Sequence, residues 1–375
     1  MRAICKDSDT VCCMDVVVVG RGPAGLLLAR SLLDHVRNAH VTLVGPDEPL
    51  RPHVLSYWAD EPTPFDAFSV GSWDRLRLGP SEGSGVVAEL GRYRYHSMRA
   101  QVWADALLEE LTGSGRLSIR EGLVDRVSTD ARHATVHLRN ESVRADWAFI
   151  SGDSGLEPAC WQYFTGWEIV PDRSIDSNLP TLMDFQTPQQ GDFRFLYVLP
   201  LAPDRLLVEH VSHSPCDHER PIEVYLREQL SCTSWTIIDR EEGKTPLFPR
   251  PLVRRLGRCV RIGVAAGLAK ACTGYSLTHL WRDAERLAKS LRDLGEPKIP
   301  KHLPSLYSIA DRYFASAIER DPSVLIRALP QLFARADADA VLAFLENRAR
   351  PRELFSVAWA MPGWLNWLAG LVTHQ

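Results

Sequence analysis

The feature that most constrains the fold is a glycine motif that directly follows a run of valines. Val16–Val19 is too short for a helix, and its β-branched residues predict a buried strand. The strand is followed by Gly20-Arg21-Gly22-Pro23-Ala24-Gly25, a G-x-G-x-x-G match, and then by the apolar run Leu26–Leu33, which predicts a buried helix. Strand, glycine turn and helix in this order predict a dinucleotide-binding site.

Each glycine of the motif has its own physical task in such a site. Gly20 allows a tight turn, Gly22 lets a pyrophosphate approach the backbone, and Gly25 lets the helix pack closely on the strand. The helix N-terminus offers free N–H groups and the positive end of its dipole to phosphate. The alternative is a buried turn with incidental glycines. We predict that the cofactor contacts Gly20, Gly22, Pro23, Ala24 and Gly25.

The position of the acidic residue that would bind the ribose departs from the usual pattern. Val41–Val44 predicts the second strand of a βαβ unit, and an acidic residue that binds ribose is expected about twenty residues past the glycines. Here the strand runs into Gly45-Pro46, and the first acidic residue is Asp47. Asp47 is therefore the candidate ribose ligand, with a backbone group as the alternative.

Composition excludes several classes of protein. A chain of 375 residues is long for one core, so we expect two lobes. The net charge of −4 gives no reason to expect a nucleic-acid partner. The eight cysteines show neither disulfide-framework nor zinc spacing, the first residues do not resemble a signal peptide, and there is no apolar run long enough to cross a bilayer. These features predict a cytoplasmic protein.

The order of predicted elements indicates an α/β, Rossmann-type fold that is interrupted by a second domain. We expect residues 14–155 and 252–297 to form the dinucleotide-binding part, and residues 156–251 to form an inserted substrate domain. Within the insert, Phe193–Pro200 and Arg205–Val211 predict a hairpin of an antiparallel sheet. Residues 298–375 are helical by pattern.

A second glycine-rich stretch follows the predicted strand Cys259–Ile262. Its candidate cofactor contacts are Gly263, Ala265, Ala266 and Gly267. Thr273 and Gly274 are further candidates, because a helix is expected to start there with Thr273 as its cap. The chain closes on a tryptophan-rich segment, Phe355–Val372, with Trp359, Trp364 and Trp367. Core packing is the default interpretation of this segment, and an anchor at a membrane surface is the alternative.

Several stretches taken together resemble the FAD-dependent lycopene cyclases, over roughly residues 14–370. They are GRGPAG at Gly20, QYFTGWE at Gln162, LMDF at Leu182, FLYVLPLAPDRLLVEH at Phe195 and GRCVRIGVAAGLAKACTGYS at Gly257, with a weaker match in EEGKTP at Glu241. The resemblance implies a flavoprotein fold and bound FAD that is used reduced and returned unchanged, with NAD(P)H as a candidate reductant. It also implies a hydrophobic polyene substrate, which is protonated and closes a ring through a carbocation.

The resemblance places the catalytic carboxylate at Glu209. Glu209 lies in a nearly continuous apolar run, which favours a buried strand over an ordinary solvated glutamate. Where the family usually carries a second acid and then threonine, this chain has His210 and Val211. His210 is thus the second candidate catalytic residue, although strand alternation points it away from Glu209 and favours a packed histidine.

Other departures from the family pattern keep alternative functions open. Val264 stands where the related flavin monooxygenases carry an aspartate, which counts against an FAD hydroxylase or epoxidase. Ala271 replaces a common proline, and Ser151-Gly152-Asp153 replaces an Asp-Ser-Arg run. These differences suggest a divergent member, so a terpenoid or polyketide cyclase on the same fold stays an alternative. A flavin-binding protein without chemistry would leave Glu209 without an evident use.

Overall fold

The N-terminal strand lies at the centre of a mainly parallel sheet. The computed structural model describes residues 13–48, 50–79, 85–152, 155–175, 178–300 and 306–361. Within them, a six-stranded sheet has the order β18-β19-β12-β1-β2-β8. Its strands are β1 (Met14–Val19), β2 (Ala39–Gly45), β8 (Leu117–Glu121), β12 (Trp147–Ile150), β18 (Arg255–Leu256) and β19 (Cys259–Arg261).

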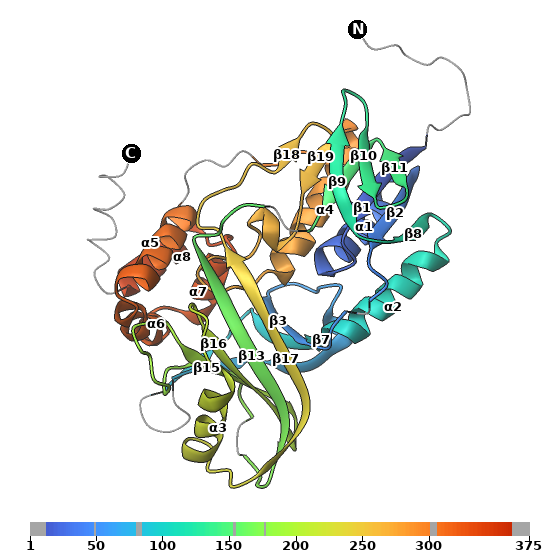
Figure 1. Cartoon of the computed structure of the whole chain (residues 1–375). Helices are drawn as coiled ribbons and strands as arrows, with labels where there is room; N and C mark the ends of the chain where they lie inside the picture. The colour runs from blue at the N-terminus through green and yellow to red at the C-terminus, as the bar shows by residue number, and fades with distance from the viewer. Residues whose placement is uncertain are drawn as a thin grey trace.

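The valine run is buried because both faces of this sheet are covered. Val16 and Val18 pack with the helices α1 (Pro23–His35) and α4 (Leu277–Leu294), while Val17 and Val19 face a small three-stranded sheet. That small sheet consists of β9 (Val124–Thr129), β10 (Ala134–Leu138) and β11 (Ser142–Ala145) (Figure 1). β1, α1 and β2 form the predicted βαβ unit, which confirms the Rossmann-type architecture.

A second, seven-stranded sheet forms the body of the other lobe. Its order is β17-β13-β16-β15-β14-β5-β6, and its pairs are antiparallel except for β14 with β5. β15 and β16 are the predicted hairpin. The strands are β5 (Arg75–Leu78), β6 (Val86–Glu89), β13 (Cys160–Pro171), β14 (Thr181–Asp184), β15 (Phe195–Ala202), β16 (Arg205–Ser212) and β17 (Trp235–Leu247). β5 and β6 come from residues that our boundaries assigned to the dinucleotide-binding part.

Strand alternation gives this sheet two different faces. Trp167, Ile169 and Val208 form a small core with helix α3 (Glu219–Glu228) on one face. On the other face, Leu199 and Leu207 pack with the C-terminal helices, which Figure 1 shows in orange and red. These helices are α5 (Leu306–Arg320), α6 (Ser323–Arg335), α7 (Ala338–Leu345) and α8 (Pro351–Ala360).

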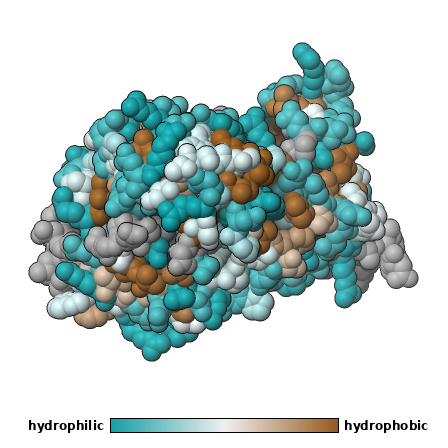
Figure 2. Space-filling view, turned by 90° about the horizontal axis from the view of Figure 1, so that it is seen from below, coloured by the Kyte–Doolittle hydropathy of each residue, from teal (hydrophilic) through white to brown (hydrophobic). Residues whose placement is uncertain are grey.

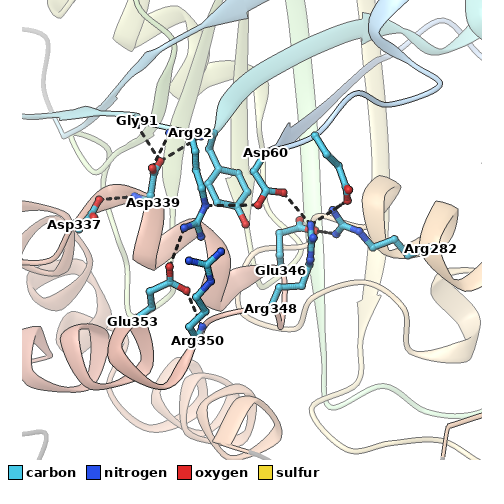
Figure 3. A network of polar contacts seen from close by, with 12 residues as sticks. Asp60, Gly91, Arg92, Arg282, Asp337, Asp339, Glu346, Arg348, Arg350 and Glu353 are labelled. Carbon is cyan, nitrogen blue, oxygen red and sulfur yellow. Dashed lines mark hydrogen bonds and ion pairs between the residues drawn. The ribbon is translucent and has the colours of Figure 1, made fainter.

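Polar contacts attach the C-terminal helices to the rest of the chain (Figure 3). The Asp339 carboxylate accepts a hydrogen bond from the backbone N–H of Arg92 at 2.7 Å. The Arg92 guanidinium donates to Glu353 at 2.8 Å, and Arg348 donates to Asp60 at 2.9 Å. Because Asp339 lies in the first turn of α7 and Glu353 in the first turn of α8, these contacts hold both helices over the sheet.

A third small sheet and its flanking helix depart from the local sequence pattern. Its strands β3 (Val54–Ala59), β7 (Arg94–Arg99) and β4 (Ser69–Trp73) lie in the order β3-β7-β4, with the short 3₁₀ helix η1 (Asp66–Phe68) before β4. The proline-rich sequence from Pro46 to Pro64 predicts a loop, but this segment contains β3. The helical periodicity of Ser97–Leu111 predicts a helix, and α2 (Ala100–Gly113) begins three residues later because the preceding residues pair with β3 and β4.

The C-terminal tryptophan segment is described only in part. Phe355 and Trp359 lie on α8, whereas Trp364 and Trp367 lie outside the described residues. Among the helices that the structure describes, none combines the length and apolar character needed to span a bilayer.

Candidate functional site

The first glycine turn leaves room for a ligand at one position and excludes side chains at two others. Gly20 has φ +103°, and a Cβ there would lie 1.9 Å from the Ser151 hydroxyl. A Cβ on Gly25 would lie 1.9 Å from the Gly20 carbonyl oxygen, whereas one on Gly22 would meet nothing within 4 Å. Helix α1 begins at Pro23 and Ala24, without a side-chain cap. Its first N–H groups are therefore available to an anion such as a pyrophosphate.

The second glycine stretch lies directly beside the first. Gly263 has φ +81°, and a Cβ there would lie 3.2 Å from Ala24 Cβ. The 3₁₀ helix η2 (Val264–Ala266) follows, contains Ala265 and Ala266, and ends at Gly267 in the left-handed conformation. The carboxyl ends of β1, β12 and β19 thus bring the two predicted cofactor segments together, which is the place where open α/β sheets bind nucleotides.

Asp47 lies on the surface, beyond the end of β2. Its side chain is 69% exposed and pairs with Arg21 at 3.3 Å, and Arg21 also donates to the Pro46 carbonyl at 3.0 Å. The exposed position leaves the carboxylate accessible to a ribose, so its role as ribose ligand stays a prediction.

The prediction that Thr273 caps a helix is wrong. Helix α4 begins at Leu277 after Ser276, and Thr273 Oγ1 instead accepts the N–H of Tyr275 within a turn. Gly274 has φ +77°, and a Cβ there would lie 1.9 Å from Gln162 Oε1. The turn delays the helix because Gly274 adopts a left-handed conformation that does not continue it. Thr273 and Gly274 line the cavity described next.

A cavity of about 640 Å³ lies between the seven-stranded sheet and the C-terminal helices. One end reaches the Thr273–Leu277 segment, which connects the second glycine stretch to α4. Most of its lining is apolar. The lining residues from the sheet include Phe164, Phe195, Tyr197, Glu209 and Val211, and those from the helices include Phe314, Leu325, Leu332, Phe344 and Val357. Such a cavity suits a hydrophobic small molecule with few polar groups.

Glu209 is the acidic group that β16 presents to this cavity. Burial raises the pKa of its carboxyl well above the usual range, and the charge of Glu241 and a hydrogen bond with it raise the pKa further. Burial and the neighbouring carboxyl therefore favour the protonated, neutral form of Glu209. A proton donor in an apolar cavity is the arrangement that general acid catalysis requires.

The partner of Glu209 is a second buried carboxyl. Glu241 lies on β17 and accepts the backbone N–H of Val54 at 2.7 Å. Burial raises the pKa of Glu241 to about 7, although the hydrogen bonds from Val54 and from Glu209 lower it. Glu241 is not among the residues that line the cavity. It is linked to the cavity through its hydrogen bond with Glu209.

Tyrosine hydroxyls surround this end of the cavity. Tyr95 OH is hydrogen-bonded to Tyr197 OH and, at 2.7 Å, to Tyr275 OH. Tyr197 OH donates to Ser56 Oγ at 2.8 Å. Burial raises the pKa of Tyr95 to about 12, so its hydroxyl stays neutral. The indole of Trp58 lies 4.3 Å from the ring of Tyr275, which adds an aromatic face to the cavity wall.

Comparison with known proteins decides the family. The family model described as lycopene cyclase protein matches residues 15–366. The chain belongs to the lycopene cyclase family.

Relatives of this family member include a lycopene beta-cyclase from Pseudescherichia vulneris. The two are 25% identical over 305 residues, which cover 74% of each chain. Among solved structures, p-nitrophenol 4-monooxygenase PnpA from Pseudomonas putida has a TM-score of 0.62 at 18% identity and covers 92% of this chain and 98% of its own. Halogenase PltM, solved with phloroglucinol and FAD, has a TM-score of 0.58 at 12% identity, with 96% and 86% covered. These structures show a shared Rossmann-type flavoprotein fold.

In this lycopene cyclase family member, His210 faces away from the cavity. Its ring is fully buried, and its Nδ1 lies 3.0 Å from Nδ1 of His218, just before α3. The Cys216 Sγ lies 3.8 Å from the His218 Nε2. The structure therefore places the two candidate catalytic residues on opposite faces of the sheet, and His210 has no contact with the cavity where Glu209 lies.

Several residues of the site escape prediction from the sequence alone. Glu241, Tyr95, Tyr197 and Tyr275 lie far apart along the chain and meet only through the two sheets and the turn before α4. For Glu241 the signal was the weak EEGKTP match. The tyrosines carry no local signal, because a buried tyrosine on a strand is usually a core residue.

The buried histidine pair predicts acid sensitivity of folding. Burial, and then the nearby His218 and Arg194, lower the pKa of His210 to about 3. The unfolded chain, with a histidine pKa of about 6.5, binds more protons between these values, so stability falls as pH falls below about 6.5. We expect His210→Gln to remove roughly 2 kcal/mol of the stability loss between pH 6.5 and 5, as measured by urea unfolding.

The control is His133→Gln in the small sheet, which should keep the pH dependence of the wild type. Identical pH profiles for the wild type and His210→Gln would contradict the assignment of a neutral, buried His210.

Proposed function

We propose that this protein is a lycopene cyclase-like FAD enzyme that protonates a polyene and closes a ring without net oxidation or reduction. The observation that carries the proposal is the position of the Glu209 carboxyl in an apolar cavity beside the cofactor segments, where burial raises its pKa. Membership of the lycopene cyclase family supports it. The substrate class is a hydrophobic polyene, in keeping with the apolar cavity wall.

Glu209 supplies the proton in this mechanism. Its carboxyl donates a proton to the terminal double bond of an acyclic polyene end, which leaves a tertiary carbocation. A neighbouring double bond attacks the cation and closes a six-membered ring. A ring carbon then loses a proton to the Glu209 carboxylate, which restores the acid. Product and substrate have the same mass, and no electrons are transferred overall.

The aromatic wall stabilises the cation and excludes water. The faces of Trp58 and Tyr275 offer negative quadrupole charge to a nearby cation. The tyrosine hydroxyls are held by one another and by Ser56, so they are neutral dipoles with fixed partners. An apolar wall around the reacting end protects the carbocation from attack by water, which would give an alcohol instead of a ring.

The residues present fit FAD, on the evidence of the open space at Gly22 and the uncapped start of α1. Gly20, Gly22, Pro23, Ala24 and Gly25 would hold its pyrophosphate, and Asp47 its ribose. Gly263, Ala265, Ala266, Gly267, Thr273 and Gly274 would hold the flavin end. When bound and reduced, for example by NAD(P)H, FAD supplies negative charge that favours a cation in the cavity.

The mouth of the cavity supports contact with a lipid surface. Phe355 and Trp359 line the cavity yet are 65% and 63% exposed, so they mark its opening. Their rings stack at 6.1 Å, and Tyr313 and Leu306 are exposed beside the same opening. Figure 2 shows one face of the molecule, on which hydrophilic residues dominate and hydrophobic residues form a few patches. Because polyenes partition into bilayers, we propose that this opening rests on the membrane surface.

The cofactor assignment is tested at Gly22. The Cβ of a valine there would meet nothing within 4 Å, and the backbone is not left-handed, so we expect Gly22→Val to fold normally and to bind FAD about tenfold more weakly or worse. FAD titration with thermal unfolding measures both effects. Gly113→Val, at another glycine with open space, should bind FAD like the wild type. Unchanged FAD affinity in Gly22→Val would refute the site.

The proton donor is tested at Glu209. With reduced FAD and lycopene under anaerobic conditions, the wild type should form a cyclic product of equal mass. Glu209→Gln should lower kcat by about 10²–10⁴-fold, because the amide cannot act as the acid. Glu242→Gln, at the exposed neighbour of Glu241, is the matched control and should keep full activity. A product that gains one oxygen would indicate a monooxygenase, and full activity in Glu209→Gln would remove the assigned donor.

The membrane contact is tested at the mouth. The double variant Phe355→Ser, Trp359→Ser should bind phosphatidylcholine–phosphatidylglycerol vesicles on the order of tenfold more weakly in sedimentation, because two exposed aromatic side chains are lost. Val102→Ser, which removes an exposed apolar residue from α2, should leave vesicle binding unchanged. An equal loss of vesicle binding in both variants, or no loss in either, would contradict membrane contact at the mouth.

A further inference from the structure

A glycine separates the two carboxyls of the site within one row of the seven-stranded sheet. Gly166 on β13 lies directly opposite Glu209 on β16 and directly opposite Glu241 on β17. Residues opposite each other in a sheet point to the same face. Strands lie about 4.8 Å apart, so the two glutamates are about two strand spacings apart, with the glycine between them.

The missing side chain at Gly166 is what allows the carboxyls to meet. A Cβ on Gly166 would lie 3.0 Å from Glu241 Cγ and 3.1 Å from Glu241 Oε1. Glu241 therefore extends across the glycine towards β16, where it is hydrogen-bonded to Glu209. Its Oε2 accepts the Val54 N–H at 2.7 Å. The Glu241 carboxyl is thus held by β3 and by its hydrogen bond with Glu209.

Nearby acidic residues favour the protonated form of Glu241 in this pair. Asp239 on β17 and Glu168 on β13 raise the pKa of Glu241. Arg99, whose own pKa is raised in part by the charge of Glu241, is already paired with Glu168 at 2.8 Å. His53, beside Val54, hydrogen-bonds to the Arg51 carbonyl at 2.7 Å, and burial lowers its pKa. Ionisation of both carboxyls is unfavourable, because two negative charges in contact repel each other.

We propose that Glu209 and Glu241 act as one hydrogen-bonded diacid across Gly166, in which Glu241 is the positioning residue that controls delivery of the Glu209 proton. This inference rests on the proposed cyclisation. The pair enters the reaction with two protons. After Glu209 protonates the polyene, the O–H of Glu241 donates to the new Glu209 carboxylate and stabilises it as a shared monoanion. The proton lost from the ring then returns to the pair, so the diacid is restored.

The ionisation of Glu241 should therefore switch the reaction off. Once Glu241 has lost its proton, delivery from Glu209 would leave two adjacent carboxylates, which is unfavourable in an apolar site. The Glu241 pKa of about 7 places this loss just above neutrality. We expect kcat/KM of the wild type to fall on the order of tenfold for each pH unit above that value.

Glu241→Gln tests this role, because glutamine can accept the Val54 N–H and donate to the Glu209 carboxylate at every pH. We expect Glu241→Gln to keep activity at pH 6 within several-fold of the wild type and to lack the loss above pH 7 that Glu241 causes. The ratio of variant to wild-type kcat/KM isolates Glu241, since all other titrating groups are common to both. Glu242→Gln should reproduce the wild-type profile. A constant ratio from pH 6 to 9 would overturn the proposal.

Infrared difference spectra of the FAD-bound protein test the pair without turnover. The carbonyl stretch of one protonated carboxyl should persist above the pH at which the second titrates and should vanish in Glu209→Gln. The second should titrate near pH 7 and vanish in Glu241→Gln. Absence of both signals would overturn the diacid even if cyclisation occurs. Both signals without conversion of lycopene would uphold the pair and reject the proposed reaction. Gly166→Ala should shift both signals, because its methyl group displaces Glu241.

Discussion

The site depends on one electrostatic constraint, which is a carboxyl group held in an apolar cavity. Removing a carboxylate from water is costly unless a cation compensates it, so the group keeps its proton instead. Here the neighbour of Glu209 is another carboxyl, Glu241, which raises the pKa of Glu209 further. The nearby Arg99 pairs with Glu168, one row along the sheet, so its charge compensates that carboxylate first. The result is a carboxyl group whose protonated form is favoured.

Glu209 lies between the seven-stranded sheet and the C-terminal helices. The seven-stranded sheet places Glu209, Gly166 and Glu241 in one row and turns His210 to the opposite face, against α3. The C-terminal helices close the cavity over that row. Their attachment is polar, through Asp339 and Glu353, whereas their inner surface is apolar. This division keeps charged groups at the edge of the cavity and leaves Glu209 among aromatic and aliphatic side chains.

Local sequence patterns predicted those parts of the fold that depend on local contacts. The βαβ unit, the β15–β16 hairpin and the helical C-terminal region follow from periodicity and turn residues, and both glycine stretches were recognised as one site. Parts that depend on partners distant in sequence were not predicted. β3 forms because β7 pairs with it, and α4 begins at Leu277 because Gly274 turns the chain beside Gln162. Glu209 was found by resemblance, whereas its contact with Glu241 needs three strands in register.

The likeness to monooxygenases and halogenases shows how little of the chemistry is set by the fold. A Rossmann-type flavoprotein fold brings a flavin site and a substrate cavity together, and redox enzymes use that proximity for electron or oxygen transfer. A proton donor opposite the same site changes the outcome, because a protonated alkene needs negative charge nearby and no electron acceptor. In the proposed mechanism, the row of Glu209, Gly166 and Glu241 would supply this donor from the sheet alone. The proposed cyclase would thus differ from the redox enzymes of the same fold through side chains of its cavity, while the fold itself stays the same.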